Sequence, residues 1–192
     1  MLVPMKIRQL LWVVALSAAA WPARGDVLDS AAGGFTVKIA VTIHASPHDV
    51  YTHLLRVADW WDSAHTFSGN SHNLRLEAIP TGCFCEDFRN GGGVRHMDVV
   101  YVEPDKTLVL RGGLGPLQRL ASSGSLTLAL AATPDGTRLE LTFAAAGYLP
   151  AGMNTLAAPV DGVLTEQVNR LKNLVEQGSP APAKKQVSPA PR

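Results

Sequence analysis

The chain has 192 residues, of which 46% are hydrophobic, 17% charged and 6% aromatic, and it contains 2 Cys. This length and hydrophobic content fit one domain with a real core, and they exclude a chain that is disordered throughout. Two cysteines are too few for a disulfide-stapled scaffold, and a formal net charge of +1 argues against a dedicated nucleic-acid binder.

The first 25 residues have the pattern of a secretory signal. Lys6 and Arg8 form a basic start, residues 10–20 are an uncharged apolar run, and the small residues Ala23 and Gly25 precede a cleavage site after Gly25. The apolar run has about half of the ~20 residues that a membrane-spanning helix needs, so a retained anchor is the weaker interpretation. We therefore expect export to the periplasm or the medium, with no transmembrane segment after cleavage.

The remaining chain divides into three parts. Residues 26–34 are interpreted as an N-terminal linker, residues 35–177 as one domain, and residues 178–192 as a disordered tail rich in Pro, Ala and Lys. The leader and the tail each carry three bases and no acid, which leaves 11 bases and 16 acids, a net charge of −5, in residues 26–177. This acidity is a second argument against a nucleic-acid partner.

The domain begins with a strand and a helix. Residues 35–43 alternate apolar and polar side chains, which predicts a strand with one buried face. Ser46, Pro47 and Asp49 then suit the first positions of a helix over residues 47–57. Apolar residues at steps of three and four predict a closing helix that begins near Pro159 and ends at Gly178. Between the helices, strands are predicted at 74–79, 83–88, 94–102, 107–111, 126–130 and 139–145.

This order predicts an α+β architecture in which a curved antiparallel sheet of about six to seven strands wraps around the long C-terminal helix. Short sequence phrases accompany it: Ser46-Pro47, Trp60-Trp61, Gly82-Cys83-Phe84, Tyr101-Val102-Glu103-Pro104 and Gly136-Thr137-Arg138-Leu139. In order and phrases the chain resembles the START-like (SRPBCC) superfamily, the Bet v 1-like helix-grip proteins, in its polyketide cyclase and Hsp90-ATPase-activator-like branch. The resemblance specifies a fold more than a function, because none of the phrases is a catalytic signature.

The hairpin after residue 83 carries the candidate catalytic pair. A turn centred on Gly91 would place Glu86 opposite His96. A histidine beside a carboxylate in an apolar cavity suits general acid–base catalysis, and the alternative is a cross-strand pair that only stabilises the hairpin. Further ligand contacts are expected on the same face, at Phe84, Phe88 and Asp98.

Other candidate ligand contacts lie at the ends of the predicted elements. Trp60, Trp61 and His65 follow the first helix, where the helix-grip fold has its cavity mouth, although a tryptophan there also suits core packing. Arg111 would pair with a ligand carboxylate, or it would be a solvated surface cation. Tyr148, at the end of the last strand, would reach the cavity with its hydroxyl.

Cys83 and Cys85 share one face of a strand, with Cα atoms about 6.5–7 Å apart in extended geometry, at the edge of what a disulfide allows. Three states stay open: free buried thiols, a strained or intermolecular disulfide, and a metal site with further ligands. Export disfavours free thiols, and no histidine stands at zinc-motif spacing. No metal and no cofactor are expected.

Three functions follow. The first is an exported domain that binds a small hydrophobic or amphipathic molecule between the sheet and the C-terminal helix, a concave apolar space of the kind that ligands occupy. The second is a cyclase- or dehydratase-like enzyme that uses His96 and Glu86. The third is a non-catalytic envelope module that contacts another protein through Trp60 and Trp61. The ligand and the oligomeric state do not follow from the sequence.

Overall fold

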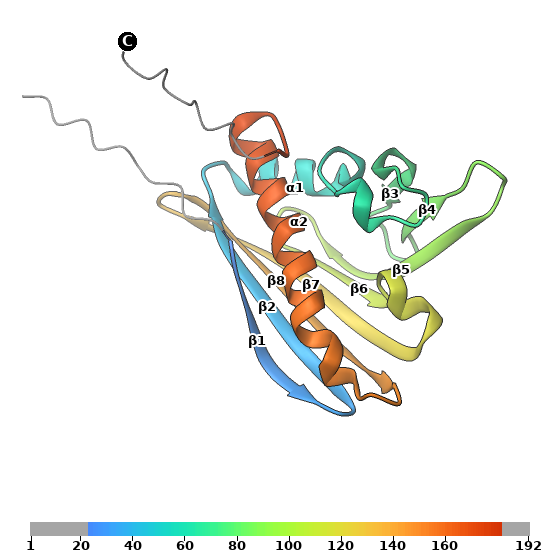
Figure 1. Cartoon of the computed structure of the whole chain (residues 1–192). Helices are drawn as coiled ribbons and strands as arrows, with labels where there is room; N and C mark the ends of the chain where they lie inside the picture. The colour runs from blue at the N-terminus through green and yellow to red at the C-terminus, as the bar shows by residue number, and fades with distance from the viewer. Residues whose placement is uncertain (1–22, 182–192) are drawn as a thin grey trace, which may run out of the picture.

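The computed structural model describes residues 23–181, which form one antiparallel sheet with a long helix across one face (Figure 1). The helices are α1 (Pro47–Leu55) and α2 (Ala157–Gln177). The strands are β1 (Arg24–Ala31), β2 (Gly34–Ile43), β3 (Leu74–Leu76), β4 (Cys83–Asp87), β5 (Gly93–Glu103), β6 (Thr107–Gly112), β7 (Ala121–Thr133) and β8 (Gly136–Tyr148). Short 3₁₀ helices connect them: η1 (Val57–Asp59), η2 (Ser63–His65), η3 (Ser71–Asn73), η4 (Gly115–Arg119) and η5 (Met153–Leu156).

The predicted α+β helix-grip architecture is confirmed, with one more strand than expected. The described residues form an eight-stranded sheet in the order β1-β2-β8-β7-β6-β5-β4-β3. The additional strand is β1, so the prediction of a linker over residues 26–34 is wrong. Most side chains of β1 are exposed, so no alternating pattern marks it in the sequence. It forms because its backbone pairs with β2 at the sheet edge, with Val27 opposite Val37.

Local sequence signals set the helix ends. The Ser46 side chain accepts a hydrogen bond from the Asp49 amide (3.2 Å), as an N-cap does. Helix α1 ends at Leu55, two residues before its predicted end, because the chain then turns into η1. Helix α2 ends at Gly178, whose left-handed backbone (φ 71°) lets its amide bond the carbonyl of Leu174.

Helix α2 is held over the sheet by apolar packing and by two buried polar residues. Leu164, Val168 and Leu171 are buried against the sheet core. The Lys172 ammonium donates to the carbonyl of Thr42 (2.6 Å) and to Glu176, so its charge is paired inside the fold. Gln167 accepts a hydrogen bond from the Asp62 amide (2.8 Å). This last contact ties the helix to the chain segment that follows α1.

The predicted leader and tail lie for the most part outside the described residues. At the N-terminal boundary, β1 begins at Arg24, and the Ala23 amide donates to Asn169 (2.7 Å). A cut after Gly25 would therefore remove part of the fold. Within residues 23–181, no helix combines the length and the apolar character needed to cross a membrane.

Candidate functional site

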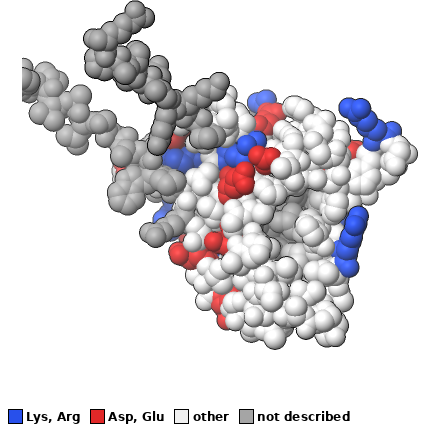
Figure 2. Space-filling model, in the orientation of Figure 1, with Lys and Arg blue, Asp and Glu red and all other residues white. Residues whose placement is uncertain are grey.

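A cavity of about 340 Å³ lies between the sheet, α2 and the connecting segments. Strands supply Phe84, His96 and Phe143 to its wall, and α2 supplies Val163 and Leu164. The segment around η2 and residues 114–120, which include η4, close its other sides. The volume is within the range of small-molecule sites. On the face drawn in Figure 2, charged side chains are scattered rather than gathered at one place.

Most of the polar atoms in the cavity wall are already hydrogen-bonded within the protein. The lining side chains that carry nitrogen or oxygen are Trp61, His65, Thr66 and His96. The Trp61 indole donates to the carbonyl of His65 (3.0 Å), and the Thr66 hydroxyl donates to a backbone carbonyl (2.8 Å). The His65 ring contacts the Gln167 amide nitrogen (3.1 Å). The cavity therefore presents mainly apolar surface, apart from His96.

Glu86 and His96 form a buried pair beside the cavity. His96 Nε2 lies 3.2 Å from Glu86 Oε2, and the two side chains are 4% and 0% exposed. Glu86 also accepts hydrogen bonds from the amides of Phe67 (3.1 Å) and Ser68. The carboxylate thus binds three donors at once, and it anchors the segment that carries Phe67 to the cavity wall.

The environment favours a charged Glu86 carboxylate and a neutral His96 imidazole. Burial by itself would raise the pKa of Glu86, but hydrogen bonds from Ser68, Phe67 and His96 outweigh it and leave that pKa below its ordinary value. Burial lowers the pKa of His96, and the hydrogen bond and charge of Glu86 offset this only in part. A neutral imidazole that donates from Nε2 to a carboxylate carries no proton on Nδ1. His96 Nδ1 is therefore the unprotonated ring nitrogen.

A β-bulge brings His96 to the cavity face. Phe84 of β4 pairs with Met97 of β5, and the next residue, Cys85, pairs with Arg95. His96 is thus an extra residue on β5. As a result His96 and Met97 are consecutive and both buried, where a regular strand would alternate.

The bulge also explains why a wrong register still gave the correct pair. Glu86 pairs with Val94 along the backbone, and not with His96 as predicted. An unbroken ladder from the Phe84–Met97 pair would put Arg95 on the cavity face and turn His96 outward. With the bulge, Arg95 lies outside instead and contacts Asp98 (3.0 Å).

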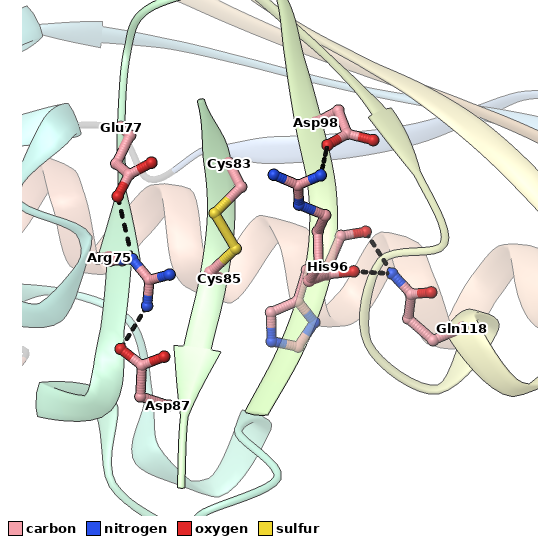
Figure 3. The surroundings of a disulfide bond; sticks show 9 residues. Arg75, Glu77, Cys83, Cys85, Asp87, His96, Asp98 and Gln118 are labelled. Carbon is pink, nitrogen blue, oxygen red and sulfur yellow. Dashed lines mark hydrogen bonds and ion pairs between the residues drawn. A yellow bond between two sulfur atoms is a disulfide. The ribbon is translucent and has the colours of Figure 1, made fainter. Parts of the chain in front are cut away.

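Gln118, which the sequence analysis missed, and Gly112 support the bulge. The Gln118 side chain donates to the carbonyls of Arg95 and His96, the latter at 2.7 Å (Figure 3). Gly112 lies against the same turn of backbone, because a Cβ there would come within 2.7 Å of the His96 carbonyl oxygen. Gly112 ends β6 beside β5, and Gln118 reaches the bulge from η4, so both contacts depend on the tertiary structure.

Cys83 and Cys85 form a disulfide on the face of β4 opposite to Phe84, beside the Arg75 ion pairs (Figure 3). Cys85 pairs along the backbone with Arg75 on one side and with Arg95 on the other. Free thiols and a metal site, the other two states considered, are therefore wrong. The Cα atoms are 5.5 Å apart, against about 6.6 Å for two residues of an extended strand. The shortened stretch of β4 lies directly across from the bulge in β5. Among residues 23–181, no group of three or more His, Cys, Asp or Glu side chains is placed to hold a metal.

The structure brings only some of the predicted contacts to the cavity. Trp61, His65, Phe84 and His96 line it, and Glu86 lies behind His96. The other five do not line it. Trp60 is buried with its indole donating to the His53 carbonyl (3.1 Å), which is the core-packing alternative, and Phe88 lies at a separate surface depression. Asp98 and Arg111 are on the outer side of the sheet, where Arg111 is an exposed cation, and Tyr148 is 71% exposed.

These corrections have physical reasons. The one-residue difference in register turned Asp98 outward, and Phe88 lies beyond the end of β4. Trp60 and Trp61 are both buried, so they offer no exposed apolar edge to a partner protein. The sequence analysis also missed Phe67, whose ring stacks on His96 with 5.9 Å between centroids. It lies in a polar stretch with no periodic signal.

The chain belongs to the family described as polyketide cyclase / dehydrase and lipid transport, which it matches over residues 34–176. This confirms the resemblance noted from the sequence. No curated protein matches the chain significantly.

Solved structures with the same fold span most of the chain. Protein MLL2253 from Mesorhizobium loti has a TM-score of 0.54 at 20% identity, covering 73% of this chain and 96% of that one. The Aha1 dimer from Colwellia psychrerythraea has a TM-score of 0.54 at 16% identity, covering 74% and 97%. The di-domain ARO/CYC StfQ from the steffimycin biosynthetic pathway has a TM-score of 0.51 at 16% identity, covering 77% and 52%. At these identities the likeness concerns the fold.

Proposed function

We propose that this protein binds a small hydrophobic or amphipathic molecule in the cavity between the sheet and α2. The observation that carries the proposal is the cavity itself: about 340 Å³ of space walled mostly by apolar side chains. Domain cores are normally packed to the density of organic crystals, so a space of this size inside a small domain is a feature to be explained. Membership of a family described as including lipid transport supports the same proposal.

Native purification followed by mass spectrometry of extracted small molecules tests this directly. The variant Val163→Phe places a ring into the cavity from α2, and Val100→Phe makes the same change at an exposed position of β5. We expect Val163→Phe to lose the copurifying molecule and Val100→Phe to keep it. Equal amounts of ligand in both variants, or none in the native protein, would contradict the proposal.

A second candidate function is acid–base chemistry on the bound molecule. The specific observation is that His96 lines the cavity while its Nε2 is held by a buried carboxylate. Such an arrangement leaves Nδ1 without a proton in an apolar environment, so that a substrate able to reach it would transfer a proton to it.

Proton abstraction from 5-nitrobenzisoxazole, a general probe for a base in an apolar site, tests this second function. We expect ring opening above the solution rate, and its loss in His96→Phe. A rate that does not depend on His96 would leave binding as the only supported function.

We also propose that the protein is exported, and that the leader is cut before Ala23 rather than after Gly25. The basic and apolar start supports export. So does the disulfide, because disulfides persist in oxidising compartments. Retention of Ala23 keeps its hydrogen bond to Asn169. The intact mass of the protein from the periplasm or medium checks both statements, and a full-length cytoplasmic product would contradict them.

A further inference from the structure

We propose that the disulfide between Cys83 and Cys85 is a redox switch for the cavity, and that its reduction by a dithiol loosens the wall around Phe67 and weakens the binding of a hydrophobic molecule. The inference rests on the proposed binding function and adds a means of regulation to it. The switch connects three features: the disulfide in β4, the carboxylate of Glu86 that follows it, and the wall segment that this carboxylate holds.

The disulfide constrains the local geometry of β4 more than it stabilises the whole fold. Only Phe84 lies between the two cysteines, and the stabilisation that a disulfide gives by restricting the unfolded chain is smallest for such short loops. The Cα atoms of Cys83 and Cys85 are 5.5 Å apart, about 1 Å less than two residues of an extended strand span. Reduction therefore lets this part of β4 lengthen by about 1 Å while the fold persists.

Glu86, the residue after Cys85, carries this change to the cavity wall. Its carboxylate lies 3.2 Å from His96 Nε2 and accepts hydrogen bonds from the amides of Phe67 (3.1 Å) and Ser68. A displacement of about 1 Å stretches hydrogen bonds of this length beyond about 3.6 Å, where they no longer hold. Reduction therefore costs Glu86 some of the contacts that fix the wall.

Phe67 is the part of the wall that this change affects. Its ring lines the cavity, is 37% exposed, and stacks on the imidazole of His96 with 13° between the ring planes. The ring also contacts the guanidinium of Arg119, which lies 5.3 Å from the ring centre on an exposed side chain. Once Glu86 releases the Phe67 amide, the ring moves away from the cavity, and a bound hydrophobic molecule meets water on this side.

The disulfide is open to attack from the outer face of the sheet. Cys83 and Cys85 are 2% and 6% exposed, and the side chains beside Cys85 on the two neighbouring strands are those of Arg75 and Arg95. These two side chains are 43% and 59% exposed, and Figure 3 shows Arg75 beside the disulfide. Exposed side chains change rotamer within nanoseconds, so they admit a small dithiol to the sulfur atoms.

Reduction is a two-electron exchange with the dithiol. One thiolate of the reagent attacks Cys83 Sγ, and the electron pair of the S–S bond passes to Cys85 Sγ, which leaves as a thiolate between two guanidinium groups. The second thiol of the reagent then displaces Cys83 from the mixed disulfide. The reagent loses two electrons and two protons and becomes a cyclic disulfide, and the protein gains both thiols.

Amide hydrogen exchange tests the coupling between the disulfide and the wall without any ligand. We expect exchange at Phe67 and Ser68 to become about tenfold faster after reduction with dithiothreitol, because a hydrogen bond to a charged group is lost. Exchange at Ile39 of β2, which four strands separate from β4, should stay the same. Equal exchange in both states would overturn the switch. So would a disulfide that resists excess dithiothreitol in the folded protein, or a fold that is lost on reduction.

The neutral dye N-phenyl-1-naphthylamine, whose fluorescence rises in apolar surroundings, tests the consequence for binding. We expect its dissociation constant to rise about fivefold on reduction, as loss of one aromatic contact would give, and to recover on reoxidation. The variant Cys83→Ala/Cys85→Ala has no disulfide to reduce. It should therefore have the higher dissociation constant both with and without dithiothreitol.

The outcomes separate the switch from the binding function. If the dye binds the oxidised and the reduced protein equally well, the switch is refuted while the binding function stands. If the dye binds neither state, the binding function is contradicted, and the exchange rates at Phe67 and Ser68 alone decide whether the disulfide controls the wall. A response of the alanine variant to dithiothreitol would show that the reductant acts elsewhere, which also refutes the switch.

Discussion

The variant Glu86→Gln tests the central role that the structure gives to this carboxylate. Glu86 is fully buried and accepts hydrogen bonds from Phe67, Ser68 and His96. Glutamine keeps one acceptor oxygen, but its NH₂ group replaces the second oxygen and faces N–H groups that need an acceptor. A hydrogen bond to a charged group contributes about 1.5–3 kcal/mol, and loss of one partner of a buried pair costs about 3–5 kcal/mol.

We expect Glu86→Gln to lower the free energy of unfolding by about 3 kcal/mol, near the lower end of that range, because the Phe67 and Ser68 amides are only partly buried. Domains have a total stability of about 5–15 kcal/mol, so the variant should still fold. Urea unfolding at pH 7 measures the difference. Glu77→Gln, at an exposed carboxylate that contacts Arg75 (3.1 Å), is the matched control and should change stability by less than about 1 kcal/mol.

The stability difference between the native protein and Glu86→Gln should depend on pH in a defined direction. Because the pKa of Glu86 is lower in the folded protein, its stabilisation is complete above the ordinary carboxyl pKa of 4.5 and is lost as pH falls further through the folded value. The difference between native protein and Glu86→Gln should therefore shrink in acid. A loss below about 1 kcal/mol at pH 7, or one that does not change in acid, would refute the assigned role of the carboxylate.

Three further predictions concern the same region. Because burial lowers the pKa of His96, the native fold should lose stability as pH falls below the ordinary value of 6.5, and His96→Phe should lack this contribution; urea unfolding between pH 7 and pH 5 measures it. Replacement of Cys83 and Cys85 by alanine should lower the free energy of unfolding by about 1–2 kcal/mol and speed amide hydrogen exchange at His96. An unchanged exchange rate would show that the disulfide does not stabilise the bulge. Leu164→Ala should cost about 2–5 kcal/mol and enlarge the cavity, so that bulkier hydrophobic molecules bind better than they do to the native protein.

Much of the fold was readable from local patterns. The alternation of residues 35–43 gave β2, the Ser46 and Pro47 signals gave the start of α1, and Gly178 gave the end of α2. These features depend on backbone preferences and on which side chains face water, and both are set within a few residues. Strand β1 was missed because its pairing with β2 involves the backbone of exposed residues, which leaves no such pattern.

The candidate site was only partly predictable. Glu86 and His96 were chosen for their chemistry, and the structure does place them together. The assumed register was nevertheless wrong, and it also assigned Asp98 to the cavity, where it does not lie. A single inserted residue reverses the face of every following side chain, and no local pattern in the sequence announces such an insertion.

The sequence by itself determined the order of the helices and of every strand except β1, the family, and the short list of residues able to do chemistry. Only the tertiary structure decided which of them meet. His96 faces the cavity because a bulge shifts β5 by one residue against β4, and Gly112 of β6 and Gln118 of η4 support that bulge. Its free nitrogen follows from a carboxylate that also binds two backbone amides. These contacts join distant segments of the chain, so they exist only after the sheet has formed.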